Sequence, residues 1–363
     1  MKRKILAVTV AVALTLTMAV GLIGCGNGGT PAPPAPGQDP APAPVPTLYL
    51  TFAHPFSAMH DVHVDILIPL VDEVYELTEG RVQLILQPGG ALTTGGTAAD
   101  DITTGAIDLT WAIPGATPGR FPLLDFFDYG PNVFTNGVEA TQVLWNLMET
   151  NEEIYAEWNT DFKPIAIFFA EIAEIFTTGR QVRVPADMVG LQIRTHSPMG
   201  ERLLQALGAA TMNMSVAEAY DALDRGVVTG AAGPISQLQS WNLHEVTEYV
   251  TEGLNLFTPS QYMAISWSAW NRLTPQDREI LGNLFGRELS MRAALYYEQL
   301  RLDVVPFLNE VGMVFTPLTR DEVALWEAAT VDVLEEYIAH VEGLGLGGRA
   351  FWNELVATRD ALR

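Results

Sequence analysis

The sequence predicts an α/β fold with two lobes, and three observations lead to this prediction. Residues 47–54 alternate apolar and polar side chains as a strand does, and residues 59–78 place apolar side chains at helical spacing. Residues 81–86 and 106–111 repeat the strand pattern, with a short helix between them at 97–104. Strand–helix–strand units of this length predict a parallel sheet covered by helices. The remaining length and a hydrophobic content of 48% leave room for a second lobe.

The rest of the chain continues this alternation. Residues 163–170 are apolar at nearly every position, which predicts a strand buried on both faces. Thr274 and Pro275 are typical of a helix start, and this helix is expected to run to about residue 309, long enough to span both lobes. The other expected elements are helices at 136–158, 198–207, 241–249, 321–342 and 350–362, and strands at 191–194, 211–214, 262–267 and 312–315.

Residues 184–194 predict a tight turn that leads into a short buried strand. Pro185 fixes φ at the entry, the Asp187 side chain can accept hydrogen bonds from nearby backbone N–H groups, and Gly190 permits the bend. Arg194 then lies at the far end of the strand. A guanidinium held there matches a carboxylate in two-point contact, although a structural ion pair would use the same residue type.

This stretch carries a family resemblance. It reads Pro185-Ala186-Asp187-Met188-x-Gly190-Leu191-x-Ile193-Arg194, which resembles the signature of the DctP-like substrate-binding proteins of tripartite ATP-independent periplasmic (TRAP) transporters. Leu207-Gly208-Ala209 and residues 218–230 resemble the next block of that family, and Gly105-Ala106-Ile107-Asp108 an earlier one. The resemblance runs from about residue 48 to beyond 310. It implies a two-lobed periplasmic-binding-protein-like fold, with open mixed sheets, helices on both faces and a long helix spanning both lobes.

The expected division of the chain has four parts. Residues 1–24 are a signal peptide, and residues 25–46 are a lipidated cysteine and a tether. Lobe I comprises residues 47–170 and 260–290. Lobe II comprises residues 171–259 and 291–363, with the C-terminal helices.

Ligands of open α/β sheets bind beyond the carboxyl ends of the strands. This rule points to His54 and Phe56 after the first strand, and to Trp111 and Ile113 after the third. His54 is equally typical of a turn histidine bonded to backbone, and Trp111 of a core residue. In the second lobe the same rule adds four strand-end residues to the expected pocket around Arg194: His196, Ser197, Met214 and Val216.

Three positions depart from the family pattern. Glu174 stands where several sialic-acid-binding relatives carry a second arginine, Thr229 where the family has an aspartate, and Gly233 at an asparagine-like position. A glutamate does not pair with a carboxylate unless it is protonated. Glu174 would therefore hydrogen-bond a hydroxyl or amine of the ligand, or clamp Arg194. The resemblance thus implies a monocarboxylate, a zwitterion or a polyol acid rather than a simple dicarboxylate.

The N-terminus is typical of a secreted lipoprotein. A basic start at residues 2–4 precedes an apolar run to Ile23 and then Gly24-Cys25, which resembles a bacterial lipobox. A plain membrane-spanning anchor is the alternative, because the apolar run approaches the ~17–25 residues that a span needs. Residues 26–46 are mostly Gly, Ala and Pro, which favours an extended tether over a Pro-rich docking ligand. Cys25 is the only cysteine, so the folded body contains no disulfide.

The charge balance excludes several classes of partner. The net charge is −23, and removal of residues 1–24 takes away three cations and no acids, which gives −26. Nucleic acids and anionic lipid surfaces require a basic surface. Any site for an anion must therefore be local, made by one or two arginines and backbone N–H groups.

Catalytic and metal motifs were not found in the sequence. His60 and His63 with Asp61 and Asp65 have only a loose metal-like spacing, and no nucleophile–base pair is evident. We therefore expect a monomeric, extracytoplasmic, lipid-anchored receptor, neither an enzyme nor dependent on a cofactor. It would deliver a small organic acid to the membrane subunits of a TRAP transporter. The alternatives are a ligand-sensing lipoprotein that regulates a partner and an extracytoplasmic enzyme that acts on small acids.

Overall fold

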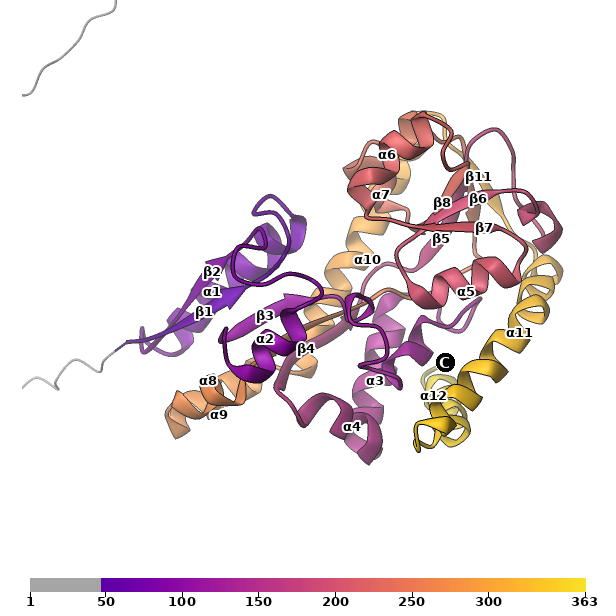
Figure 1. Ribbon diagram of the computed structural model, residues 1–363. Coiled ribbons are helices and arrows are strands. Elements are labelled where there is room, and N and C mark those ends of the chain that lie inside the picture. Colours follow the sequence, from indigo (N-terminus) through magenta and orange to yellow (C-terminus); the bar gives the residue numbers. More distant parts are fainter. Residues whose placement is uncertain (1–46) are drawn as a thin grey trace, which may run out of the picture. The chain divides into compact units, whose positions relative to one another are not determined.

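The computed structural model describes residues 47–363, which form one compact unit (Figure 1). The predicted signal peptide, Cys25 and the tether lie outside the described residues. Within residues 47–363, no helix has both the length and the apolar character that a membrane crossing requires.

The first sheet has five strands in the order β2-β1-β3-β10-β4. Strands β1 and β2 are parallel, in the register Leu48↔Val82 to Ala53↔Gln87, whereas β10 is antiparallel to both of its neighbours. The sheet is therefore mixed, as the family resemblance implies, and not parallel throughout. Its strands are β1 (Leu48–Ala53), β2 (Val82–Gln87), β3 (Leu109–Ala112), β4 (Lys163–Phe169) and β10 (Ser260–Ile265).

Helices cover both faces of this sheet. The side chains of β4 alternate between two apolar cores: Ile167 and Phe169 belong to one and Phe168 to the other. This confirms the prediction of a strand buried on both faces. The elements around the sheet are a π-helical turn η1 (His63–Leu67), then α1 (Ile68–Leu77), α2 (Ala98–Thr104), α3 (Gly137–Thr150), α4 (Glu152–Asn159), α8 (Trp267–Arg272) and α9 (Pro275–Leu284).

The predicted helix at 136–158 is two helices. Asn151 ends α3 and caps α4, because its side-chain oxygen accepts hydrogen bonds from the backbone N–H groups of Glu153 and Ile154 at 3.0 and 3.2 Å. An asparagine is a strong N-cap residue, and this local bond outweighs the apolar periodicity that suggested one helix.

The second sheet has six strands in the order β11-β9-β5-β8-β6-β7. Strand β5 is antiparallel to β8 and β9, whereas β6 is parallel to both β7 and β8. The strands are β5 (Ala173–Thr177), β6 (Gln192–Thr195), β7 (Ala210–Asn213), β8 (Gly230–Pro234), β9 (Tyr249–Glu252) and β11 (Val314–Pro317). The intervening elements are η4 (Pro185–Met188), α5 (Pro198–Ala206), α6 (Val216–Asp224), α7 (Ser236–Ser240) and η5 (Leu243–Glu245).

The predicted helix at 241–249 is wrong. Helix α7 ends before it, Asn242 adopts a left-handed conformation with φ 54°, and Tyr249 already belongs to β9. Val250 in this strand pairs with Phe176 of β5. The β-branched and aromatic residues at 249–251 are more stable in the sheet, and their helix-like spacing was coincidental.

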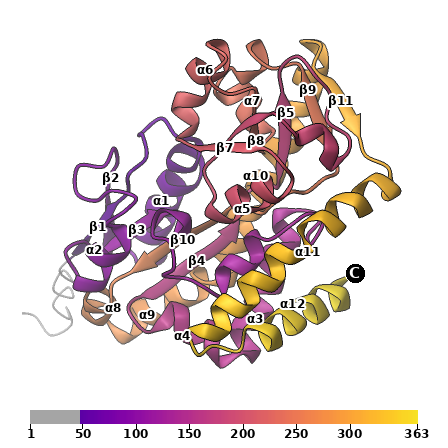
Figure 2. The ribbon, with the colours of Figure 1, turned by 45° about the vertical axis from the view of Figure 1, so that its right-hand side comes forward.

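The predicted helix from 274 to about 309 is interrupted. Gly286 has φ 83° and separates α9 from α10 (Arg287–Glu310). Helix α10 packs against α3 and β4 on the first sheet and against α7 on the second, which confirms that a long helix spans both. Figure 2 shows the terminal helices α11 (Arg320–Gly343) and α12 (Gly348–Leu362) side by side. Helix α12 packs against α3, so the C-terminal part also contacts the first half of the chain.

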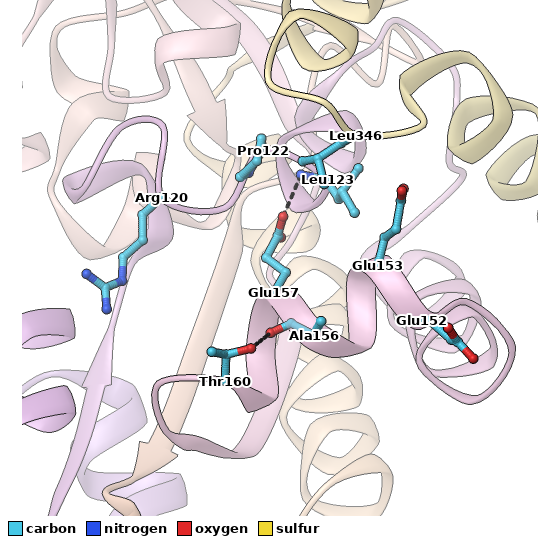
Figure 3. A pocket seen from close by; sticks show the side chains of 9 residues that line it. All are labelled: Arg120, Pro122, Leu123, Glu152, Glu153, Ala156, Glu157, Thr160 and Leu346. Carbon is cyan, nitrogen blue, oxygen red and sulfur yellow. Dashed lines mark hydrogen bonds between the residues drawn. The ribbon is translucent and has the colours of Figure 1, made fainter.

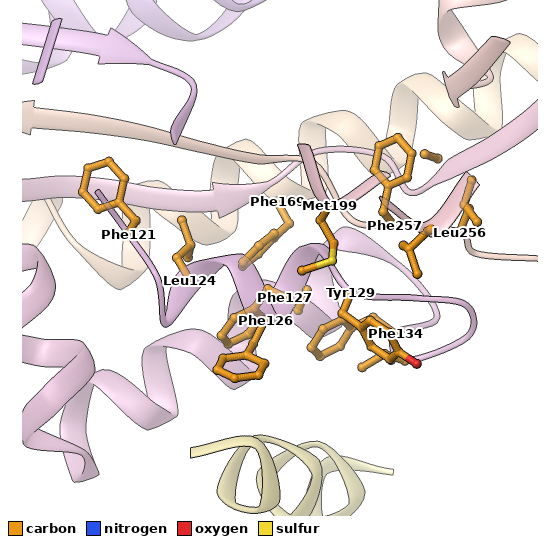
Figure 4. Packing of buried hydrophobic residues seen from close by; sticks show 14 of the residues in the cluster. Phe121, Leu124, Phe126, Phe127, Tyr129, Phe134, Phe169, Met199, Leu256 and Phe257 are labelled. Carbon is orange, nitrogen blue, oxygen red and sulfur yellow. The ribbon is translucent and has the colours of Figure 1, made fainter. Parts of the chain in front are cut away.

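The largest apolar core joins segments from both sheets. Phe127 stacks on Phe169 of β4, with ring centroids 5.0 Å apart, and Figure 4 shows these rings close to Met199 of α5 and Phe257. Phe169 ends β4 and Phe257 precedes β10, so both border the segments where the chain crosses between the sheets. The crossing segments are therefore held by a continuous core.

Candidate functional site

The chain crosses between the sheets twice within residues 163–265, after the carboxyl end of β4 and after that of β9. Three residues, Ala170 to Ile172, connect the carboxyl end of β4 to β5, and the segment between β9 and β10 returns beside them, with Ala170 N–H donating to the Pro259 carbonyl. In the second sheet, Arg194 of β6 lies in register with Met212 of β7 and Ala231 of β8. The predicted arginine thus lies within a central strand, one residue from its carboxyl end.

Arg194 is buried, with 1% of its surface exposed. Its Nε donates to the Met214 carbonyl oxygen at 3.0 Å, but its Nη1 has no hydrogen-bond partner. Among residues 47–363, no carboxylate forms an ion pair with this guanidinium. Burial lowers the pKa of Arg194 to about 10, and the more distant Glu218 opposes this shift. The side chain therefore remains a cation at neutral pH, with one donor nitrogen free.

Glu174 does not clamp Arg194. It lies on β5 opposite Gly233, and its carboxylate accepts hydrogen bonds from the backbone N–H groups of Gly253, Leu254 and Asn255 at 2.9–3.3 Å. Burial raises the pKa of Glu174 to about 8, which weakens its negative charge at neutral pH. This acid consequently leaves the charge of Arg194 uncompensated.

Gly233 lies at the end of β8 beneath the Arg194 guanidinium. A Cβ atom at this position would lie 3.8 Å from Arg194 Nη1 and 2.8 Å from Gln237 Oε1. The absence of a side chain here therefore lets both polar groups approach the same position. Gln237 is a residue that the sequence analysis missed, because a glutamine in a short helix carries no distinguishing signal.

His196 and Ser197 follow Arg194 after one residue, Thr195. Burial, assisted by the positive charge of Arg194, lowers the pKa of His196 to about 3, so its ring is neutral, and its Nδ1 has no partner. Ser197 Oγ accepts from Gly200 N–H at the start of α5 and donates to Asp128 Oδ2 at 3.1 Å. Asp128 ends the turn η3 (Leu124–Asp128), and burial raises its pKa well above the usual range. A buried acid thus ties the turn after β6 to the first half of the chain.

Met214 and Val216 contribute differently from what was expected. The Met214 carbonyl oxygen holds Arg194, whereas the side chains of Met214 and Val216 pack against an apolar cluster of α6, α7 and α10. Met214 thus contacts Arg194 through its backbone and not through its side chain.

On the first sheet, the expected residues form an aromatic cluster. His54 and Trp111 are buried, and Phe56 lies with its ring centroid 4.0 Å from that of Trp111. His54 Nε2 is 2.8 Å from His63 Nδ1, and Trp111 Nε1 donates to Gln261 Oε1 at 2.8 Å. His54 is therefore bonded to a second histidine rather than to backbone. Burial, followed by the neighbouring His63 and His60, lowers its pKa to about 4.

Ile113 is half-buried at the end of β3 and precedes a turn that approaches the second sheet. A Cβ on Gly115 would lie 3.5 Å from the Pro198 ring of α5 and 4.0 Å from Ile113. Ile113 therefore lies near Gly115, and Gly115 lies near Pro198, which follows Arg194 in the chain.

An open pocket of about 450 Å³ lies elsewhere, between α4 and the turn after α11 (Figure 3). Arg120 borders it, but its guanidinium pairs with Asp100 and Asp161 at 2.8 and 2.9 Å. This agrees with a structural role for Arg120. Residues 47–363 contain no group of three or more acidic, histidine or cysteine side chains arranged to hold a metal ion.

The comparisons with known proteins agree on one family. The family model described as "Bacterial extracellular solute-binding protein, family 7" matches residues 52–340. An uncharacterised protein of Sinorhizobium fredii is 34% identical over 186 residues, 49% of this chain and 33% of that protein. A solute-binding protein of Roseobacter denitrificans is 26% identical over 75% of this chain and 83% of its own.

Solved structures of TRAP solute binding proteins share the fold. One from a marine metagenome has a TM-score of 0.80 at 21% identity, covering 86% of this chain and 99% of its own. One from Rhodoferax ferrireducens has a TM-score of 0.79 at 23% identity, covering 87% of this chain and 98% of its own. One from Sulfitobacter has a TM-score of 0.71 at 17% identity, covering 85% of this chain and 100% of its own. These neighbours confirm the two-lobed α/β fold. Together with the match over residues 52–340, they show that the chain belongs to family 7 of the bacterial extracellular solute-binding proteins.

Proposed function

We propose that this protein is an extracytoplasmic receptor that binds a small organic acid through Arg194. The observation that carries the proposal is the buried guanidinium with a free Nη1 and no carboxylate partner in residues 47–363. Burying a charge without a partner is costly, and a bound carboxylate would supply the missing anion. A monocarboxylate suffices, because within residues 47–363 the only charged group that acts on the pKa of Arg194 is Glu218, and no second cation does so.

The ligands of the structural neighbours support this class of substrate. The marine metagenome protein is specific for aromatic acid ligands, the Rhodoferax protein holds benzoate, and the Sulfitobacter protein holds β-D-galacturonate. All of these are carboxylic acids, although their bodies differ. The carboxylate is thus the shared feature that a common arginine would recognise.

The receptor would act with partners and without turnover. It would be a monomer, anchored to the membrane through a lipid on Cys25, that delivers its acid unchanged to the membrane subunits of a TRAP transporter. The lobes would be residues 47–170 with 260–290 and residues 171–259 with 291–363, and they would close around the acid. Trp111, Ile113, His54, Phe56 and His196 would line the pocket beside Arg194.

The proposal is tested by ligand-induced stabilisation and by calorimetry. Benzoate, mandelate, lactate, pyruvate and galacturonate are screened for a rise in the melting temperature, since a ligand stabilises the folded state by RT ln(1 + [L]/Kd). For the acid that binds, Arg194→Ala should raise Kd by about 10- to 150-fold, because a charge-assisted hydrogen bond contributes roughly 1.5–3 kcal/mol.

Arg225→Ala is the matched control. Arg225 is an exposed arginine that pairs only weakly with Asp221, at 3.7 Å. This variant should bind the acid as the wild type does. Unchanged affinity in Arg194→Ala would remove Arg194 from the site, and recovery of a chemically altered acid would show an enzyme instead of a receptor.

A further inference from the structure

Two buried polar atoms near Gly233 lack partners. They are Nη1 of Arg194, which can only donate a hydrogen bond, and Oε1 of Gln237, which can only accept one. Both lie close to the position that a Cβ of Gly233 would occupy, at 3.8 and 2.8 Å. They come from different elements, since Arg194 is on β6 and Gln237 on α7, which packs against β8.

A buried polar atom without a partner is rare in native proteins and requires an explanation. A donor and an acceptor that lie beside the same position without bonding each other are complementary to a ligand that offers the opposite pair. Such a ligand must accept from Arg194 Nη1 and donate to Gln237 Oε1. A carboxylate with a hydroxyl on the neighbouring carbon provides both groups at short range.

An ammonium would also donate to Gln237, but its charge would require a carboxylate nearby. The two buried acids of this region are already used. Glu174 accepts three backbone N–H groups, and Glu171 accepts from Ile235 N–H at 2.7 Å and from Ser236 N–H. The ring of His196, which is close to Arg194 in the chain, is neutral. A neutral hydroxyl therefore fits this site better than an ammonium.

We infer that Gln237 is a specificity residue that accepts a hydrogen bond from the 2-hydroxyl of the bound acid, so that the receptor prefers 2-hydroxy acids. The inference rests on the proposed function, because Arg194 must hold the carboxylate for Gln237 to reach the neighbouring carbon. Gly233 takes part because a side chain at this position would clash with Gln237 Oε1.

The experiment measures Kd by calorimetry for acids of one skeleton that differ only at the second carbon. The probes are lactate, propionate, pyruvate and alanine, and the aromatic series mandelate, phenylacetate, benzoylformate and phenylglycine. In the wild type, the hydroxy acid should bind most tightly within its series. Gln237→Leu should weaken the hydroxy acid roughly 3- to 10-fold, as loss of one neutral hydrogen bond does, and leave the unsubstituted acid unchanged.

Gln239→Leu is the control, because Gln239 is an exposed glutamine on the same helix. It should change neither affinity. Gly233→Ala gives a second approach, since its methyl group would displace Gln237 Oε1 and should also reduce the preference for the hydroxy acid.

Each other outcome is informative. Equal weakening of hydroxy and unsubstituted acids by Gln237→Leu, or no change in either, would overturn the inference while the proposed function stands. Dependence of the keto or amino acid on Gln237, instead of the hydroxy acid, would also overturn it. Binding of these acids that is unaffected by Arg194→Ala, or no binding of any acid in these series or in the first screen, would instead contradict the proposed function and the inference with it.

Discussion

At the scale of single residues, the molecule keeps one arginine charged in its interior. Arg194 is held by the Met214 carbonyl oxygen alone, whereas the nearby acids turn to backbone N–H groups. Removing a charge from water typically costs several kcal/mol, even after the protein relaxes. This arrangement is unfavourable without an anion and becomes favourable with one, which is the expected property of a binding site.

A second unusual group of residues is the histidine cluster beside Trp111, formed by the buried His54 and His63 and the half-buried His60. Burial lowers the pKa of all three. The neighbouring His63 and His60 lower the pKa of His54 further, and His63 also lowers that of His60, which Asp61 opposes. The cluster is neutral at pH 7. Protonation would put like charges side by side in an apolar environment.

The cluster predicts a loss of stability in acid. The pKa of His54 is about 4 in the folded protein and about 6.5 when unfolded, so the unfolded chain binds a proton first as the pH falls. Stability is fully present above pH 6.5 and decreases between pH 6.5 and 4, by on the order of 3 kcal/mol. Urea unfolding of the wild type and His54→Phe at pH 7 and pH 4 measures this contribution.

The difference between the two pH values should be smaller for His54→Phe by about that amount. His340→Gln, at an exposed position of α11, should leave it unchanged. An equal pH dependence in wild type and His54→Phe would show that this histidine does not titrate with folding.

The sequence predicted the position of Arg194 but not its surroundings. Residues 184–194 predict the turn through Pro185 and Gly190 because these residues act locally. Asp187 indeed accepts from the N–H groups of Arg183 and Val184. The orientation of Glu174 and the approach of Gln237 depend on contacts between segments distant in sequence. No local pattern encodes such contacts, so these two features required the structure.

At the scale of elements, strands and helix starts were predicted better than helix ends. The helix start expected at Thr274 is confirmed, since the Thr274 side chain accepts from Asp277 N–H at 3.1 Å and α9 begins at Pro275. Two long helices were each predicted as one because apolar periodicity continues across Asn151 and Gly286. The helix predicted at 241–249 was wrong for a different reason. Residues 249–251 pair with β5, and this pairing outweighs the helical spacing of their apolar side chains.

The break at Gly286 predicts contrasting effects of two glycine substitutions. Gly286 has φ 83° and ψ −130°, a conformation that only glycine adopts easily, and its N–H donates to Ile165 of β4 at 2.7 Å. Gly286→Ala should therefore destabilise the protein by about 1–3 kcal/mol. Gly282→Ala, within α9 and in open space, should stabilise it by roughly 0.5–1 kcal/mol through helix propensity.

Urea unfolding of both variants tests the pair. The same residue change at two glycines four positions apart controls for composition, so only the backbone conformation differs. Equal stabilisation by the two alanines would mean that α9 and α10 can join into one continuous helix at no cost.

At the scale of the whole molecule, residues 47–363 form one compact unit. The core around Phe127 and Phe169 joins both sheets. Helix α10 contacts elements of both sheets, and α12 contacts α11 and α3. These contacts all lie within residues 47–363. For the preceding segment, the sequence alone predicts secretion and attachment to the membrane.

This separation gives the last prediction. If Cys25 is a lipobox cysteine, protein extracted from membranes should have lost residues 1–24 and gained the mass of acyl chains, because two or more chains are needed for stable anchoring. Cys25→Ser should remove the lipid mass and leave residues 1–24 attached, whereas Ala32→Ser in the tether should process normally. Intact mass spectrometry distinguishes the cases. Wild-type protein that retains residues 1–24 would indicate a membrane-spanning anchor instead.

Because residues 47–363 form a compact unit, a protein that consists of them alone should bind its acid with the same affinity as the full chain. Calorimetry on both proteins compares the two affinities. A weaker affinity of the shorter protein would assign the N-terminal segment a part in the site.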